Sequence, residues 1–520
     1  MNRLFVGVLT LFVFGAMAVS CIEEPTMSFE DIENRSLKAW VEKYKPELLD
    51  NYQEEGGYYV EVLNEGVLDS LPITGKDVWL WYDFTGRDLA GNICETRDWM
   101  LAKQLNTYTP HTHYVPSFRF SGKESTTMME GTYLATFNKL NIDGKEFEVR
   151  YGTELRIYMP SSIVVIESAD GGYQGQYSLD EGKPLVVDMR IYGHVANPVA
   201  YEGNRVEAFA KVNGGLCAEH KTEVVKDESA ETKARRRMVT RADEGAEVDT
   251  RPLEFYDGRW HQPIDTMAHL LVNYAYSPAR QSFDYNAVGA DTLMYNREDV
   301  SENVYAAGDV YGASTMSDID RRINEALVER FGEGISIDDV LDADSLKTKP
   351  TAKVWYVGRF LDGFIFDTNI DEVKEIVYGK VATKGEALSF STSDPEDNDY
   401  ILAWNYSLPT LRRGQWATIL TVSTYAYGLD GQMGSTTSTT TNTNQAYYDY
   451  ANYYNYMNYM NSYYGYGYGN MYNNGYYGYN PYYYGYTPPV SGEDTSVTVT
   501  TTSTEIQAFT PLLFQVFVEK

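Results

Sequence analysis

One stretch decides the fold of the C-terminal half of this sequence: VWYVGRFLDGFIFD, residues 354–367. Two runs rich in apolar and aromatic residues lie on either side of Asp362-Gly363, a dipeptide typical of tight turns between paired strands. The stretch therefore predicts a strand, a turn and a second strand. The first strand carries a Tyr-x-Gly pattern at 356–358, and the second ends in Phe366-Asp367.

Two further segments belong with this one. Residues 404–415, WNYSLPTLRRGQ, predict a short helix that carries a tryptophan, followed by a Gly-Gln turn, a strand and Tyr425-Ala426-Tyr427-Gly428. Ile506 and residues 509–516, FTPLLFQV, predict a closing strand. In their order and internal spacing, the three segments resemble the FKBP family of peptidyl-prolyl cis-trans isomerases. The resemblance covers residues 335–520, less an insertion at 433–504.

The resemblance implies an α+β fold, in which an antiparallel sheet wraps around a short helix, and an aromatic pocket for proline. Trp404 would form the floor, Tyr427 would donate a hydrogen bond to a substrate carbonyl, and Ile401 would offer its backbone N–H. The remaining members would be walls (Tyr356, Phe366, Phe514), a further substrate contact (Ile506) and a charge near the rotating carbonyl (Asp367).

The chemistry suits these residue types. Amide resonance gives prolyl rotation a barrier of about 18–20 kcal/mol, and a dry aromatic pocket can bind the twisted imide better than the planar one. This chemistry needs no nucleophile, cofactor or metal. Three functions stay open: an active isomerase that assists the folding of exported proteins, a noncatalytic peptide-binding or chaperone module, and a surface adhesive protein.

The N-terminal half resembles a degenerate copy of the same domain over residues 50–200. Gly57–Gly66 and Gly75-Lys76-Asp77-Val78 have the order of its first strand and turn. Phe84-Thr85-Gly86, Gly91 and Cys94-Glu95 stand where Tyr-x-Gly, Gly and Phe-Asp would be, and Gly152–Pro160 would match the later turn and strand. No floor tryptophan is found, so this copy would act as a scaffold or hold peptides.

Local patterns predict further elements. Ser28 with Asp31 indicates a capped helix through Tyr44, stopped by Pro46. Its buried side is predicted to consist of Phe29, Ile32, Trp40, Val41 and Tyr44. Strands are expected at 58–63, 78–84, 150–159 and 184–191, and their wide spacing favours antiparallel pairing. A second helix is predicted over Ser317–Phe331, capped by Ser317 and ended by Gly332, within a region 253–334 that is otherwise unassigned.

The N-terminus predicts export. Arg3 and an apolar run at 4–14 precede the small residues of 15–20 and then Cys21, a pattern that resembles a bacterial lipoprotein signal. We expect lipidation of Cys21, a tether before the helix, and a place in the cell envelope, at the outer membrane on a side left open. An ordinary signal peptide with a chance cysteine is the alternative.

Composition narrows the partners. The 520 residues carry a formal net charge of −31, which repels phosphate backbones and argues against nucleic acid. Proline-containing or unfolded polypeptides, and a membrane through the lipid, are the expected partners. Residues 218–252 predict a charged linker, and the Tyr/Asn/Gly-rich insertion at 433–504 predicts a disordered loop, with an adhesive surface as its alternative. His111 and His113 are interpreted as part of a loop rather than a metal site.

Overall fold

The computed structural model describes residues 28–73, 78–121, 128–164, 183–217, 253–285, 316–336, 339–340, 343–344, 346, 351–379, 384–391, 400–432, 434–442 and 496–520. The predicted signal segment with Cys21, the Gly75-Lys76-Asp77 turn, the charged segment 218–252 and residues 443–495 of the insertion lie outside this part. The chain separates into two compact units, one holding both large sheets and the other holding a hairpin.

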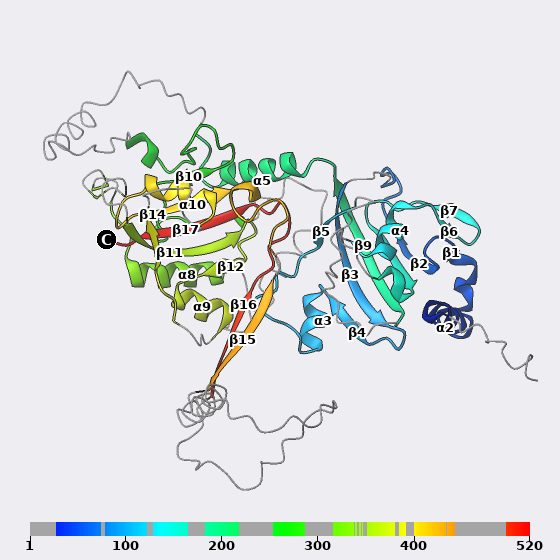
Figure 1. Ribbon diagram of the computed structural model, residues 1–520. Coiled ribbons are helices and arrows are strands. Elements are labelled where there is room, and N and C mark those ends of the chain that lie inside the picture. Colours follow the sequence, from blue (N-terminus) through cyan, green and yellow to red (C-terminus); the bar gives the residue numbers. More distant parts are fainter. Residues whose placement is uncertain are drawn as a thin grey trace, which may run out of the picture. The chain divides into compact units, whose positions relative to one another are not determined.

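The first sheet contains all four strands predicted for the N-terminal half. Its order is β1 (Tyr52–Gln53), β2 (Tyr58–Glu65), β8 (Thr153–Met159), β9 (Leu185–Val195), β3 (Trp79–Asp88) and β4 (Ile93–Thr96), with β5 (Ser117–Phe120) on β3 (Figure 1). Every pairing is antiparallel, as predicted. The other elements here are α3 (Trp99–Gln104), α4 (Glu130–Phe137) and the β6–β7 hairpin (Leu140–Ile142, Lys145–Phe147).

The second sheet confirms the strand–turn–strand prediction. Its order is β10 (Leu271–Asn273), β14 (Trp416–Thr421), β17 (Leu512–Val518), β11 (Thr351–Phe360) and β12 (Ile365–Thr368), with β13 (Leu388–Ser391) on β11. Side chains alternate between its two faces. Phe514, Val516 and Val518 enter one core with α10 (Leu402–Ser407), whereas Leu513 and Phe517 enter another with α8 (Met316–Phe331) and α9 (Asp371–Tyr378).

Apart from β1, which has no counterpart in the second sheet, the two sheets share a strand order, and their β3–β4 and β11–β12 ladders share a register. In β3–β4, Gly86 pairs with Glu95 and Arg87 with Ile93; in β11–β12, Gly358 pairs with Asp367 and Arg359 with Ile365. Each ladder shifts register directly after its glycine. This register matches the predicted correspondence of Gly86 and Glu95 with Gly358 and Asp367. The α+β arrangement with antiparallel sheets therefore occurs twice in the chain.

Each copy also includes a helix that precedes its first strand. In the first copy this is α2 (Phe29–Tyr44), capped by Ser28 as predicted, and in the second it is α5 (Pro198–Val212). The predicted buried side of α2 was wrong for three of its five residues: Phe29, Ile32 and Tyr44 are 66%, 47% and 56% exposed. Val41 is buried and Trp40 packs against the same core, as predicted, and Leu37 joins them, because these positions face Tyr59 and Tyr158 of the sheet.

The region that the sequence left unassigned contributes to the second core. Three of its aromatic residues pack against α8 and against Phe209 of α5: Trp260, Phe283 and Tyr285. Helix α8 begins at Met316, so Ser317 lies inside it rather than capping it, while Gly332 follows its end with a φ of +75°, as predicted. Second-copy residues therefore extend well before position 335.

The sequence predicted a disordered loop over the whole of 433–504. This is wrong for the two ends of the insertion. Its first and last parts form an antiparallel hairpin, β15 (Ser435–Asn442) with β16 (Ser496–Ser503). Both strands are rich in threonine, whose branched side chain favours extended backbone.

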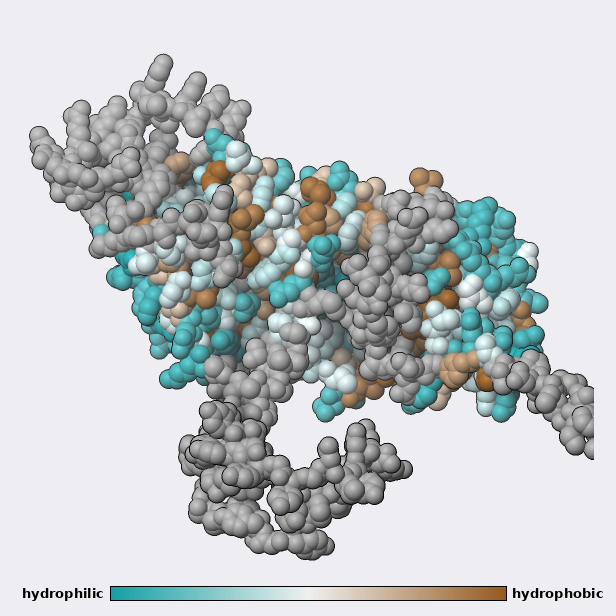
Figure 2. Space-filling view, viewed as in Figure 1, coloured by the Kyte–Doolittle hydropathy of each residue, from teal (hydrophilic) through white to brown (hydrophobic). Residues whose placement is uncertain are grey.

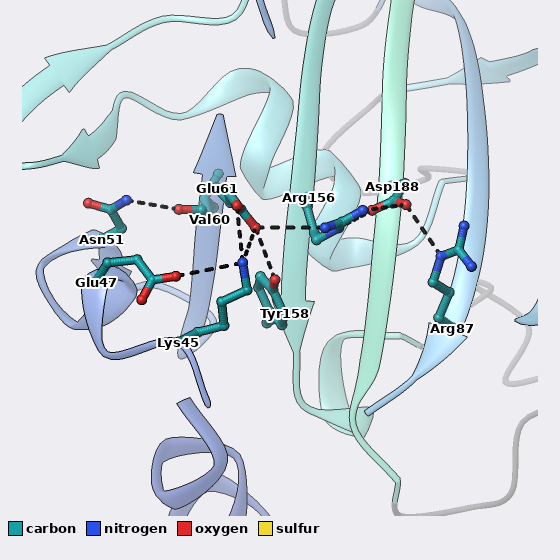
Figure 3. Close-up of polar contacts among 9 residues, drawn as sticks. All are labelled: Lys45, Glu47, Asn51, Val60, Glu61, Arg87, Arg156, Tyr158 and Asp188. Carbon is teal, nitrogen blue, oxygen red and sulfur yellow. Dashed lines mark hydrogen bonds and ion pairs between the residues drawn. The ribbon is translucent and has the colours of Figure 1, made fainter. Parts of the chain in front are cut away.

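The two copies differ on one face of their sheets, the face that carries Asp188 in the first copy and Gln515 in the second. In the first copy, charged residues cross the strands there: Glu61 binds Lys45 at 3.3 Å and Tyr158 at 3.0 Å, and Asp188 binds Arg156 at 2.5 Å (Figure 3). In the second copy α8 covers the matching face, and the buried Arg359 binds Gln515 at 2.7 Å and Asp320 at 2.7 Å. Hydrophilic residues gather on the surface around α8 and α9 (Figure 2).

Candidate functional site

The strands and helix of the second sheet bring the predicted pocket residues into one cluster. β11 carries Tyr356, β12 carries Phe366 and Asp367, and β17 carries Phe514. Trp404 lies in α10, and Ile401 is the residue at the N-cap of that helix. Phe366, Trp404, Ile506 and Phe514 belong to the buried core of the cluster, and Tyr356, Ile401 and Tyr427 pack against it while partly exposed.

Ring contacts join five of these residues. The Trp404 ring lies 4.9 Å from Tyr356 and 5.4 Å from Phe514, centroid to centroid, with interplanar angles of 75° and 80°. Phe366 contacts Phe514 at 5.8 Å and Tyr427 at 6.2 Å, with angles of 81° and 88°. All four contacts are edge-to-face, the arrangement that aromatic quadrupoles favour. The rings therefore hold one another at fixed angles.

The Tyr-x-Gly pattern has a steric cause. A Cβ atom added at Gly358 would lie 2.8 Å from Cζ of Phe366, so any larger residue would displace that ring. The absence of a side chain at position 358 lets the Phe366 ring lie over β11. This contact explains why glycine stands two residues after Tyr356.

A short hydrogen bond links the two polar residues of the cluster. The Tyr356 hydroxyl donates to Oδ2 of Asp367 at 2.5 Å. Neighbouring protein atoms partly desolvate the Asp367 carboxyl and raise its pKa, although the residue as a whole is exposed. The hydrogen bond from Tyr356 lowers this pKa and offsets part of the rise. Burial and the nearby Asp367 raise the pKa of Tyr427 to about 12. At neutral pH both tyrosines are therefore protonated and can donate hydrogen bonds.

Trp404 carries a further donor. Among the described residues, no hydrogen-bond partner reaches its buried Nε1. A buried donor without a partner costs about 1–3 kcal/mol, and such groups in native structures call for an explanation. A ligand carbonyl near the indole would supply the missing acceptor.

The first copy holds one side of the cluster, which the sequence did not predict. Ile506 exchanges two backbone hydrogen bonds with Gln432, both 2.8 Å, and its neighbour Glu505 binds Arg97 at 2.8 Å and Arg119 at 2.7 Å. Gln507 accepts from the backbone N–H of Phe118 at 2.6 Å. The three contacts of Glu505 and Gln507 join residues 386 to 408 positions apart, so no local pattern marks them.

Among the positions that can be matched, the first copy keeps an aromatic ring at that of Tyr356 and lacks one at those of Phe514 and Trp404. The register places Phe84 at the position of Tyr356 and Val187 at that of Phe514. Counted from the N-cap residues Met129 and Ile401, Thr132 takes the place of Trp404. The absence of a floor tryptophan agrees with the sequence prediction.

The side chains of His111 and His113 contact side chains of the second copy. His113 Nε2 is 2.7 Å from Oδ2 of Asp362, in the turn between β11 and β12, and its ring stacks on Phe360 at 4.7 Å. His111 stacks on Tyr378 at 4.0 Å.

Within the described ranges no helix is long and apolar enough to cross a membrane.

No protein-family model and no curated protein matches this chain. Solved structures that it is similar to are peptidyl-prolyl isomerases of the FKBP type. FkpA from Escherichia coli is 11% identical (TM-score 0.21; 38% of this chain, 75% of that chain), and an isomerase from Pseudomonas syringae pv. tomato is 16% identical (0.21; 33% and 98%). The three FKBP domains of wheat FKBP73 are 8% identical (0.18; 90% and 95%).

Proposed function

We propose that the second copy is a peptidyl-prolyl cis-trans isomerase that assists the folding of exported proteins. The observation that carries this proposal is the edge-to-face aromatic cluster around Trp404, with its Tyr356–Asp367 hydrogen bond. The residues that form the cluster are those that the FKBP resemblance selected. Its substrates would be proline-containing or unfolded polypeptides.

The mechanism follows from the residue types. The proline ring would lie on the Trp404 indole, and Tyr427 would donate its hydroxyl to a substrate carbonyl. Twisting the imide bond removes its resonance, and the carbonyl then tolerates a dry aromatic surrounding better than in the planar state. Phe366, Phe514 and the Tyr356–Asp367 pair would surround that carbonyl.

An isomerisation assay on a proline peptide tests the proposal. Because α5 and residues 253–285 belong to the second core, the assay requires the whole mature chain rather than residues 335–520. Tyr427→Phe keeps the ring and removes one hydrogen bond, worth about 0.5–1.5 kcal/mol net. We expect the catalysed rate to fall roughly two- to twelvefold while the fold survives. A rate at background for the unmutated chain, with residues 443–495 present or deleted, would refute catalysis.

A noncatalytic peptide-binding or chaperone role is the second candidate. The first copy favours it, because this copy keeps the fold with Val187 and Thr132 at the positions of Phe514 and Trp404. Binding of an unfolded polypeptide without catalysed isomerisation would support this role. The adhesive role would rest on the Tyr-rich insertion, and deleting residues 443–495 would abolish it alone.

We further propose that Cys21 carries lipid and anchors the protein in the cell envelope, at the outer membrane. The small residues before Cys21 and the apolar run before them support this proposal. Glu23 and Glu24 resemble the acidic signal of surface lipoproteins, and protease treatment of intact cells would decide the side.

A further inference from the structure

A buried carboxylate lies directly behind the turn that carries Tyr427. Glu202 of α5 is 1% exposed. Its Oε1 accepts the backbone N–H of Ser423 at 2.5 Å, and its Oε2 accepts the Ser423 hydroxyl at 2.9 Å. Both oxygens of this side chain are therefore committed to a single residue, which is 221 positions away in the chain.

Ser423 is the first residue of the turn. Its carbonyl accepts the N–H groups of Ala426 and Gly428, each at 2.9 Å, so the backbone on either side of Tyr427 is tied to it. Farther along, Gln432 pairs with Ile506. The turn is thus held at its start by Glu202 and beyond its end by the 505–507 segment. Displacing Ser423 would displace the Tyr427 ring.

The first copy repeats this contact without the tyrosine. Glu33 of α2 is 5% exposed and accepts the N–H and the hydroxyl of Ser161 at 2.7 and 2.6 Å. Ser161 begins the 3-10 turn Ser161–Ile163, as Ser423 begins Ser423–Tyr425. The third residue of the turn is Ile163 in the first copy and Tyr425 in the second. The same pair of Glu–Ser hydrogen bonds therefore occurs in both copies. Only in the second copy does the turn lead to the proposed site.

We propose that Glu202 is a positioning residue that sets the Tyr427 hydroxyl for the peptide substrate. This inference rests on the proposed function. Glu202 does not touch substrate itself; it acts through Ser423 and the turn.

The test compares Glu202→Gln with Glu33→Gln. The amide oxygen can accept only one of the two serine hydrogens, and the amide NH2 can meet the hydroxyl only if the hydroxyl turns to accept; each variant therefore loses the negative charge and one serine-to-carboxylate hydrogen bond in the same geometry. We expect Glu202→Gln to lower kcat/KM on a proline peptide by roughly five- to tenfold, the order of one hydrogen bond. It should also speed amide hydrogen exchange over residues 423–432. Glu33→Gln should lower the Tm by about as much as Glu202→Gln does. It should change neither kcat/KM nor the amide exchange over residues 423–432.

The outcomes separate the two proposals. Equal losses of activity in both variants would show that Glu202 is merely structural and would overturn the inference. Unchanged exchange at 423–432 in Glu202→Gln would also overturn it, whether or not the unmutated chain isomerises peptides. An inactive unmutated chain refutes the isomerase proposal only, because the exchange measurement needs no substrate. If Glu202→Gln does not fold, Ser423→Ala removes one of the two bonds, with Ser161→Ala as its control.

Discussion

An ion-pair cluster between the two copies gives a quantitative prediction. Glu505 is 23% exposed and binds Arg97 and Arg119, which are 10% and 19% exposed. Burial by itself would raise its pKa, but the two arginine charges lower the pKa from 4.5 to about 2. At about 1.36 kcal/mol for each unit, the folded state gains roughly 3 kcal/mol from ionised Glu505 at neutral pH.

Glu505→Gln removes this charge and keeps the side chain's size. Because the folded pKa lies below the ordinary value, the stabilisation is complete above about pH 4.5 and is lost as the pH falls toward 2. We expect thermal unfolding at pH 7 to show a Tm several degrees lower than in the unmutated chain. At pH 3 the difference should shrink to about half or less.

Glu146→Gln is the control for this experiment. Lys139 and Glu146 form an ion pair of the same length, 2.8 Å, but their side chains are 61% and 74% exposed, so little change is expected. Equal Tm values for Glu505→Gln and the unmutated chain at pH 7 would refute the reasoning, as would a difference that does not depend on pH.

Three further variants test other parts of the structure. Glu95→Gln should raise the Tm at pH 8 but not at pH 5, because burial raises the pKa of Glu95 to about 7 and its ionised form therefore destabilises the fold; a loss of stability at pH 8 would contradict this. Gly358→Ala should cost about 1–3 kcal/mol in chemical denaturation by displacing Phe366, whereas Gly86→Ala, whose Cβ would meet its nearest atom at 3.6 Å, should be tolerated; equal costs would argue against the steric cause. Cys21→Ala should release the protein from membranes, and unchanged partition in cell fractionation, with no lipid mass on the N-terminus, would refute the anchor.

Short-range patterns in the sequence predicted the local structure well. The Asp362-Gly363 turn joins β11 and β12, Ser28 caps α2, and Gly332 ends α8. Each of these features depends on the conformational preference of one or two residues and on partners within a few positions. The aromatic residues at 356, 366, 404 and 514 also do form one cluster, which the FKBP resemblance implied.

The tertiary structure alone decided which distant residues meet. Helical spacing leaves several possible buried faces for α2, and the packing of Leu37 and Val41 against the sheet selected one that exposes Phe29. The threonines of β15 became a strand only through pairing with β16. Glu202 with Ser423, and Glu505 with Arg97, are separated by 221 and 408 positions. Such contacts form because a buried carboxylate must find donors wherever the packed chain brings them, and no pattern along the sequence records that encounter.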